Sequence, residues 1–130
     1  MSYVGVVLVS HSEKMVEGLA EFLSQVQGQV PVAIAGGTEE GELGTSMQKI
    51  MKAIESVYSD QGVIILFDFG SASLSIEMAI EMLGPDKLIR VADAPLVEGA
   101  YAAVVQASVQ SSLEKVLASA EKAGNLRKLP

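Results

Sequence analysis

Short apolar runs alternate with longer amphipathic stretches along most of the chain. The apolar runs are continuous and rich in β-branched residues, which is typical of strands covered on both faces. They occupy Tyr3–Val9, Val30–Ala35, Gly62–Phe67 and Leu88–Ala92. Because each run is followed by apolar residues at helical spacing, the pattern predicts an α/β fold of four strand–helix units. Right-handed connections then give an open, mainly parallel four-stranded sheet with helices on both faces.

The first two helices have recognisable faces and ends. Their apolar faces are expected to consist of Met15, Leu19, Phe22, Leu23 and Val26, and then of Met47, Ile50, Met51, Ile54 and Val57. Ser12 is a suitable N-cap for the first helix, and Gly28 is a suitable end for it. Thr45 and Gln48 have the spacing of a capping box at the start of the second helix.

The second half of the chain predicts two more helices. The third is expected to begin near Ser71 or Ser73 and to stop at Gly84-Pro85. Pro95 suits the first turn of a last helix, which we expect to be long and rich in alanine. Its apolar residues in register are Tyr101, Val105, Val109, Leu113, Val116 and Leu117. The tail 124–130 is expected to fray.

Composition narrows the class of protein. The chain has 130 residues, 49% of them hydrophobic and 19% charged, which suits one packed domain over residues 1–130. The chain has no Cys, which excludes disulfides, thiolate catalysis and zinc sites built from Cys. Its one His excludes a metal site built from several His. We expect neither a metal nor a cofactor. A net charge of −7 disfavours nucleic acid and anionic membranes as partners. The N-terminus does not have the pattern of a signal peptide. The apolar runs are much shorter than the ~20 residues needed to span a bilayer, so we expect a cytoplasmic protein.

His11 is the leading candidate for a functional residue. In an open parallel sheet, ligands bind beyond the carboxyl ends of the strands, and His11 directly follows the first strand. A neutral imidazole is available as a nucleophile near neutral pH, since its ordinary pKa is ~6.5. The free N–H groups and positive dipole end of the adjacent helix suit a bound phosphoryl group. The alternative is a capping or surface histidine.

Asp68 follows the third strand and is the natural partner of His11. If the first and third strands are neighbours, its carboxylate reaches one imidazole nitrogen, fixes the tautomer and leaves the other nitrogen free to attack. The alternative is that Asp68 only caps a turn. Small and polar residues at the same edge are candidates for phosphoryl binding through hydroxyl and N–H groups. They are Ser12, Gly37, Thr38, Thr45, Gly70, Ser71 and Ser73.

Four motifs near the strand ends carry a resemblance to a known family. They are Val9-Ser10-His11-Ser12, Gly44-Thr45, Asp68-Phe69-Gly70-Ser71-Ala72 and Ala94-Pro95-Leu96-Val97-Glu98-Gly99. In this order they resemble the phosphotransfer subunit of the bacterial phosphotransferase-dependent dihydroxyacetone kinase, which is itself similar to the mannose-class enzyme IIA domain. The resemblance implies a flavodoxin-like homodimer with a phosphohistidine at His11 and an orienting aspartate at Asp68.

The same resemblance implies a phosphoryl relay with two partners. The donor is the histidine-containing phosphocarrier protein of the phosphoenolpyruvate-dependent phosphotransferase system. The acceptor is ADP on the nucleotide-binding subunit of the kinase, and the ATP formed there phosphorylates dihydroxyacetone. The chain would thus be the phosphohistidine subunit of a phosphotransferase.

Three other interpretations stay open at this point. A mannose-class enzyme IIA domain of a sugar transporter would use the same chemistry with a different acceptor. A response-regulator receiver domain would be phosphorylated at Asp68, but it needs an acidic pair after the first strand to hold magnesium, where this chain has Ser10-His11-Ser12. A non-catalytic, dimeric binding module would use the apolar last helix for association.

Overall fold

The computed structural model describes residues 2–130, and its centre is a sheet of four parallel strands in the order β2-β1-β3-β4. The strands are β1 (Gly5–Ser10), β2 (Val32–Gly36), β3 (Val63–Phe67) and β4 (Ile89–Val91). The inner strands β1 and β3 consist almost wholly of apolar residues, as strands buried on both faces do. The predicted open parallel sheet is confirmed.

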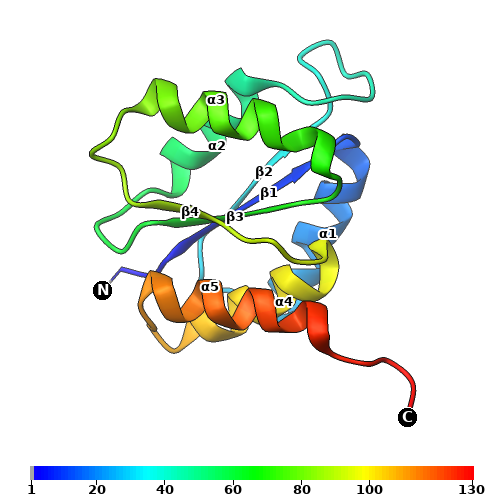
Figure 1. The fold of residues 1–130 in the computed structure, drawn as a ribbon, viewed down its shortest axis with the longest axis vertical. Coiled ribbons are helices and arrows are strands. Elements are labelled where there is room, and N and C mark those ends of the chain that lie inside the picture. The colour runs from blue at the N-terminus through cyan, green and yellow to red at the C-terminus, as the bar shows by residue number, and fades with distance from the viewer. Residues whose placement is uncertain (1) are drawn as a thin grey trace.

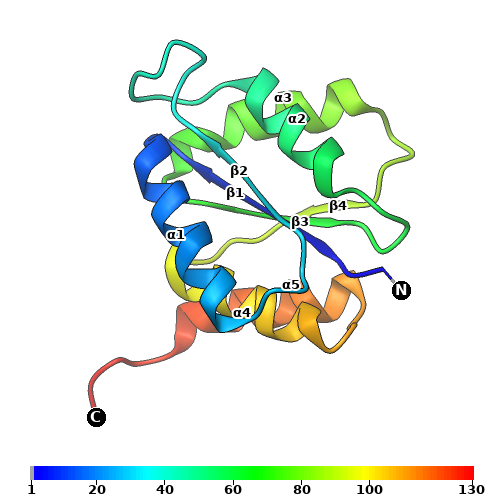
Figure 2. The same ribbon diagram turned by 180° about the vertical axis from the view of Figure 1, so that it is seen from behind.

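Helices cover both faces of the sheet, as expected. α2 (Met47–Val57) and α3 (Ser73–Leu83) pack on one face, and α1 (Glu13–Val26), α4 (Leu96–Ser108) and α5 (Leu113–Lys122) pack on the other. Figures 1 and 2 show the two helical layers from opposite sides, with the sheet between them. The short 3-10 turns η1 (Gly70–Ala72) and η2 (Ala123–Asn125) precede α3 and follow α5.

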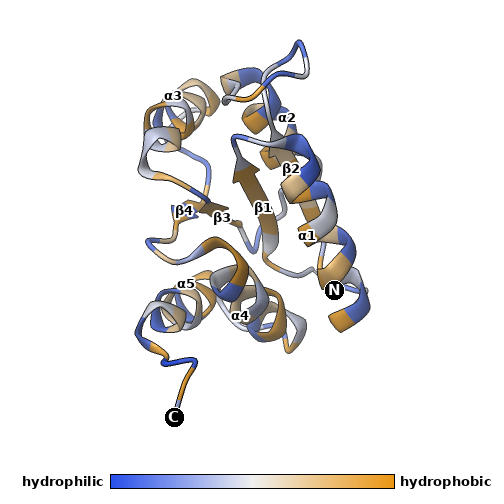
Figure 3. Cartoon of the chain, turned by 90° about the vertical axis from the view of Figure 1, so that its right-hand side faces the viewer, coloured by the Kyte–Doolittle hydropathy of each residue, from blue (hydrophilic) through white to orange (hydrophobic). Residues whose placement is uncertain are grey.

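The alternation of side chains along β1 divides the interior into two hydrophobic cores. Val6 and Leu8 belong to the core under α1, α4 and α5, whereas Val7 and Val9 belong to the core under α2 and α3. All four side chains are fully buried, and burial of each stabilises the fold by about 1.5–3 kcal/mol relative to exposure. Figure 3 shows β1 as a strongly hydrophobic segment at the centre of the molecule. Along the inner strands β1 and β3, the one polar side chain is therefore at a strand end.

The start of α2 corrects the predicted capping box. Ser46, not Thr45, is the N-cap, and its hydroxyl accepts a hydrogen bond from the N–H of Lys49 at 3.2 Å. Thr45 shares a hydrogen bond of 2.8 Å with Ser75 of α3 instead. The prediction was wrong by one residue because the chain enters the helix one position later, so that a different hydroxyl faces the free N–H groups.

The helix α1 begins where it was predicted to begin, but two residues of its predicted apolar face are exposed. Ser12 is the N-cap, as expected, and the helix ends at Val26 with Gln27 as C-cap. Its buried residues are Val16, Leu19 and Leu23. Met15 and Phe22, which the periodicity placed on the apolar face, are 52% and 49% exposed.

The single long helix expected after Pro95 is wrong, because the chain turns between α4 and α5. Gln110 lies in this turn with a φ of 60°, a conformation that no α-helix continues through. Tyr101, Val105 and Val109, expected on the buried face, are 46%, 42% and 70% exposed. The small residues of α4 face inward instead, and they allow α5 to pack closely against it.

The C-terminal tail has structure in its first part. The turn η2 includes residues 124 and 125, and the ammonium of Lys128 pairs with the carboxylate of Glu98 at 2.6 Å. The expected fraying of 124–130 stays a prediction. No helix within residues 2–130 is both long and apolar enough to cross a membrane.

The register of the sheet determines which loops meet. β1 pairs with β3 so that Val9 lies opposite Phe67, and the residues that follow these two strands emerge side by side. On the other flank of β1, Ser10 lies opposite Gly36 at the end of β2. The loops after three strands therefore converge on His11.

Candidate functional site

His11 and Asp68 form a direct pair at the carboxyl edge of the sheet. The imidazole Nδ1 lies 2.9 Å from Asp68 Oδ1, and the backbone N–H of His11 donates to Asp68 Oδ2 at 2.9 Å. Because a carboxylate only accepts hydrogen bonds, Nδ1 carries the proton in this contact. The side chain of His11 is 27% exposed, whereas that of Asp68 is 5% exposed. The carboxylate is thus enclosed, and the ring can be reached from outside.

Asp68 stays ionised because hydrogen bonds outweigh the effect of burial. Burial acts to raise the pKa of this carboxyl, but the N–H of His11, its imidazole, the Ser10 hydroxyl and the N–H of Phe69 all act to lower it. The net result is a pKa below the ordinary value. The negative charge that Asp68 carries at neutral pH stabilises the Nδ1–H tautomer of His11 and any positive charge that develops on the ring.

The second imidazole nitrogen faces Ser71. The Ser71 hydroxyl lies 2.9 Å from Nε2, and because Nδ1 holds the proton of the neutral ring, this hydroxyl donates and Nε2 accepts. The Phe69 ring lies beside the imidazole, with 5.8 Å between the ring centroids. The nitrogen with the free electron pair is therefore Nε2, and it lies on the exposed side of the pair.

The turn η1 brings further predicted residues to this position. The backbone N–H groups of Gly70 and Ser71 have no acceptor within residues 2–130, because they precede the first hydrogen-bonded turn. Ser73 is the first residue of α3, and its N–H bonds to Gly70. The Ser71 hydroxyl therefore lies next to Nε2, and the two free N–H groups belong to the same short turn.

The remaining candidates lie on the α1 side and in the loop between β2 and α2. The Ser12 hydroxyl accepts from the N–H of Met15 at 3.3 Å as a cap of α1. Gly37, with a φ of 72°, donates its N–H to the Ser10 carbonyl at 3.1 Å. The N–H of Gly44 donates to the His11 carbonyl at 2.9 Å. The loop is thus joined at one end to the backbone of Ser10 and at the other to the backbone of His11.

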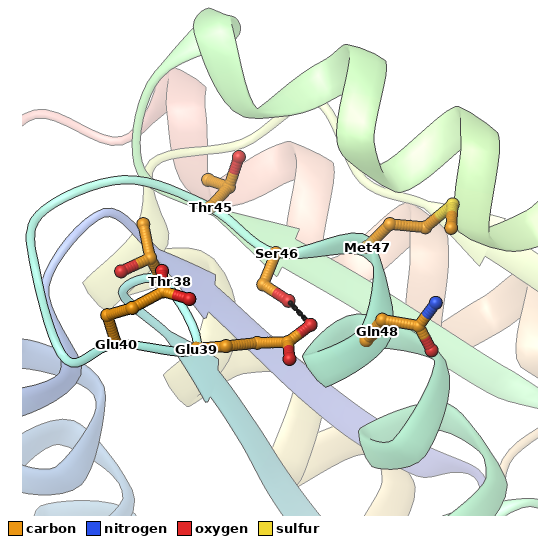
Figure 4. Close-up of a pocket in the computed structure, with 7 residues that line it drawn as sticks. All are labelled: Thr38, Glu39, Glu40, Thr45, Ser46, Met47 and Gln48. Carbon is orange, nitrogen blue, oxygen red and sulfur yellow. Dashed lines mark hydrogen bonds between the residues drawn. The ribbon is translucent and has the colours of Figure 1, made fainter.

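The hydroxyls of Thr38 and Thr45 have partners away from His11. Thr38 accepts from the N–H of Glu42 at 3.1 Å, and Thr45 bonds to Ser75. Both threonines line a shallow polar pocket, shown in Figure 4, together with Glu39, Glu40, Ser46, Met47 and Gln48. Within residues 2–130 no group of three or more His, Asp and Glu side chains is placed to hold a metal ion.

Two residues at the site were not singled out by the sequence. Ser10 is fully buried, and its hydroxyl donates to Asp68 Oδ2 at 2.9 Å. Lys49 of α2 bonds to the Gly36 carbonyl and to Glu13 Oε2, so a cation from a distant segment lies at this edge. Ser10 could have been found, because it is a polar residue at the end of an apolar strand. Nothing in the sequence pointed to Lys49.

The site presents one oriented imidazole at the edge of a parallel sheet, an arrangement that is compatible with a phosphocarrier. In agreement, residues 5–117 match the family of the phosphotransferase-system fructose IIA component, EIIA-man. The chain is 42% identical over 117 residues to the phosphoryl donor subunit DhaM of dihydroxyacetone kinase 2 from Listeria innocua, and covers 94% of that protein. It therefore belongs to the EIIA-man family and, within it, to the DhaM phosphoryl donor subunits.

Other relatives differ mainly in length. The chain is 35% identical to the phosphotransferase subunit DhaM of Lactococcus lactis, covering 96% of it. It is 40% identical to the DhaM subunit of Escherichia coli, but spans only 25% of that longer protein.

Solved structures share the fold. The crystal structure of a protein of unknown function superposes with a TM-score of 0.85 at 39% identity, with 95% of this chain and 97% of that chain covered. The mannose/sorbose-specific IIA subunit from Enterococcus faecalis superposes with a TM-score of 0.60 at 17% identity, with 100% of this chain and 98% of that chain covered. The latter likeness shows that the fold is that of mannose-class IIA domains.

Proposed function

We propose that His11 carries a phosphoryl group between two partner proteins. The observation that carries this proposal is the contact of 2.9 Å between His11 Nδ1 and the ionised Asp68, which leaves Nε2 as the nucleophile on the exposed side of the ring. Membership of the DhaM subunits, whose names describe them as phosphoryl donors, supports the same role. The chain then acts as the phosphohistidine subunit of a phosphotransferase.

The first transfer is an in-line displacement at phosphorus. Nε2 of His11 attacks the phosphorus, a new N–P bond forms, and the bond from phosphorus to the donor breaks with its electron pair returning to the donor. The Nδ1–H stays in place, so the phosphorylated ring carries a positive charge that faces Asp68 at 2.9 Å. In the second transfer an acceptor oxygen attacks the phosphorus, and Nε2 regains its electron pair.

The phosphoryl oxygens would be held by groups next to Nε2. The Ser71 hydroxyl must turn from the nitrogen as the phosphoryl group arrives, and from there it donates to a phosphoryl oxygen, together with the N–H groups of Gly70 and Ser71. Ser12, Gly37, Thr38, Thr45 and Ser73 remain secondary candidates, because their described contacts are within loops and caps.

The partners that we propose are those that the resemblance to the family implies. We propose the histidine-containing phosphocarrier protein as donor and ADP on the nucleotide-binding subunit of dihydroxyacetone kinase as acceptor, in the cytoplasm. The names of the DhaM relatives support the kinase, rather than a sugar transporter, as the destination of the phosphoryl group. The protein itself needs no cofactor in this scheme.

The decisive experiment is phosphorylation by the purified phosphocarrier proteins and phosphoenolpyruvate, followed by mapping of the modified residue. We expect one acid-labile, base-stable phosphate at His11, with none in His11→Ala. Phosphate of the opposite stability, mapped to Asp68, would support the receiver-domain alternative instead.

The acceptor needs a second measurement. Phosphorylated protein mixed with the ADP-loaded kinase subunit is expected to produce ATP, with no ATP formed when ADP is left out. A stable phosphohistidine in the presence of that subunit would contradict the kinase assignment and favour a transporter domain as the acceptor.

We also propose a homodimer formed through the outer surface of α4. An apolar groove there is lined by Phe22 of α1, by Val97, Tyr101 and Val105 of α4, and by Leu126 of the tail, all of which are at least 42% exposed. Light scattering of the wild-type protein is expected to give the mass of two chains, and Tyr101→Glu the mass of one. Met78→Glu, on the exposed side of α3, is the control that keeps the dimer. A wild-type protein with the mass of one chain would overturn this assignment.

A further inference from the structure

Ser10 is an unusual residue for the interior of this protein. It ends β1, and it is the polar side chain that is fully buried within residues 2–130, while the other residues of that strand are glycine or apolar. A hydroxyl in such a place is costly unless its hydrogen bonds are satisfied. The contacts of Ser10 therefore show what the hydroxyl does.

The direction of each hydrogen bond of Ser10 is determined by its partner. Its hydroxyl has one proton, and Asp68 Oδ2 at 2.9 Å can only accept, so the proton points to the carboxylate. The N–H of Ser12 at 2.9 Å can only donate, so it points to a lone pair of the same oxygen. The sulfur of Met15, 4.0 Å away, is a much weaker acceptor and does not compete for the proton.

These two bonds hold both members of the pair described above. The bond from the Ser12 N–H closes a short turn across Ser10-His11-Ser12, which determines the backbone conformation at His11. The bond to Oδ2 orients the Asp68 carboxylate, whose other oxygen meets the imidazole. One buried oxygen thus connects the backbone around the histidine with the side chain that orients its ring.

We infer that Ser10 is a positioning residue that sets the relative orientation of His11 and Asp68, and so keeps the proton on Nδ1 and the free electron pair on Nε2. Its effect on phosphoryl transfer rests on the proposed function. Its effect on the imidazole does not, because the tautomer is a property of the unmodified protein.

If Ser10 had a purely structural role, its hydroxyl would support strand β1 and not the His11–Asp68 pair. β1 is joined to its neighbours along its length by the backbone ladder, which does not involve the Ser10 hydroxyl. Loss of the hydroxyl therefore leaves the strand in place, but it removes one of the four hydrogen-bond donors to the Asp68 carboxylate and the acceptor of the Ser12 N–H. The tautomer of His11 separates the two roles, because a structural serine would not change it.

The test compares three variants by two measurements. His11 is the single histidine, so the nitrogen resonances of a ¹⁵N-labelled protein report its tautomer without overlap. Ser10→Ala removes the hydroxyl, and Ser10→Thr keeps it. Ser59→Ala is the matched control. The Ser59 hydroxyl likewise donates to one oxygen, the Tyr3 carbonyl, and accepts from one N–H, that of Gln61, but it lies away from His11 and Asp68.

Wild-type protein, Ser10→Thr and Ser59→Ala are expected to show the Nδ1–H tautomer and similar rates of phosphorylation by the donor proteins. Ser10→Ala is expected to show a mixture of tautomers and a rate about tenfold lower, the effect of one hydrogen bond to a charged group. A folded Ser10→Ala with the wild-type tautomer would overturn the inference, whatever its rate.

Two further outcomes are decided by the same data. If Ser10→Ala fails to fold, Ser10→Cys takes its place, and its weaker donor is expected to give an intermediate mixture of tautomers; the wild-type tautomer in that variant would overturn the inference. If the wild-type protein takes up no phosphate, the proposed function fails, while the tautomers still decide the role of Ser10.

Discussion

Two carboxylates at the same edge of the molecule, Asp68 and Glu98, are held below their ordinary pKa by different means. The side chain of Asp68 is 5% exposed and receives hydrogen bonds from the backbone, a hydroxyl and an imidazole that packing keeps in place. Glu98 is 35% exposed, and its pKa is lowered first by the hydrogen bond from Lys128, whose own side chain is 80% exposed.

Of these two charges, only that of Asp68 is held firmly enough to orient another group. An exposed pair between flexible side chains is screened by solvent and loses side-chain entropy, so it contributes little. A carboxylate held by four fixed donors keeps one position and stays ionised at neutral pH. We therefore expect chemistry to depend on Asp68 and to be insensitive to Glu98.

The largest expected effect comes from Asp68→Asn. The amide keeps the shape but removes the charge that favours the Nδ1–H tautomer, so the rate of phosphorylation of His11 should fall about 100-fold. Rapid-quench measurement of phosphate incorporation checks this. Glu98→Gln makes the same chemical change in the exposed pair and is the matched control. Equal rates in the two variants would break the comparison.

A smaller effect is expected from Ser71→Ala. This variant removes the hydroxyl 2.9 Å from Nε2 but leaves the free N–H groups of η1 in place. Because the hydroxyl exchanges its bond to Nε2 for a bond to a phosphoryl oxygen, the net loss is small, and phosphorylation should slow about threefold to tenfold. A rate above that of the wild-type protein in the same assay would show instead that the hydroxyl mainly blocks the nitrogen.

The stability of the fold should depend on pH through Asp68. Its pKa is lower in the folded than in the unfolded chain, so its contribution is complete above the ordinary value of 3.8 and is lost as the pH falls through and below that value. The free energy of unfolding should therefore differ less between wild-type protein and Asp68→Asn as the pH is lowered from 6 to ~3. Urea unfolding at a series of pH values measures it, and a constant difference would contradict the prediction.

The smallest effect is expected at the tail. Glu98→Gln and Lys128→Ala remove an ion pair between exposed side chains, so the melting temperature should stay within the error of calorimetry at physiological salt. A clear drop in either variant would show that the tail is held more firmly than its exposure indicates, and would make the two carboxylates more alike.

Much of this arrangement could be predicted from the sequence. The continuous apolar runs predicted four buried strands, and the residues after the first and third strands included the His11–Asp68 pair. The last helix was not predicted correctly, because the periodicity of Tyr101, Val105 and Val109 continues through a turn that a left-handed residue makes at Gln110. Periodicity reports which residues share a face, but it does not report which face is covered.

The amino-acid sequence was sufficient to predict the parallel α/β fold, the edge of the sheet that holds the candidate site, and the single histidine that we propose to carry a phosphoryl group. Three features required the tertiary structure: the strand order that places Asp68 beside His11, the imidazole nitrogen that is left free, and the burial of Ser10 between the two residues. Buried strands and helix caps can be predicted because they depend on residues that are neighbours in the sequence. An orienting hydrogen bond joins residues 57 positions apart, and only the pairing of β1 with β3 brings them within reach.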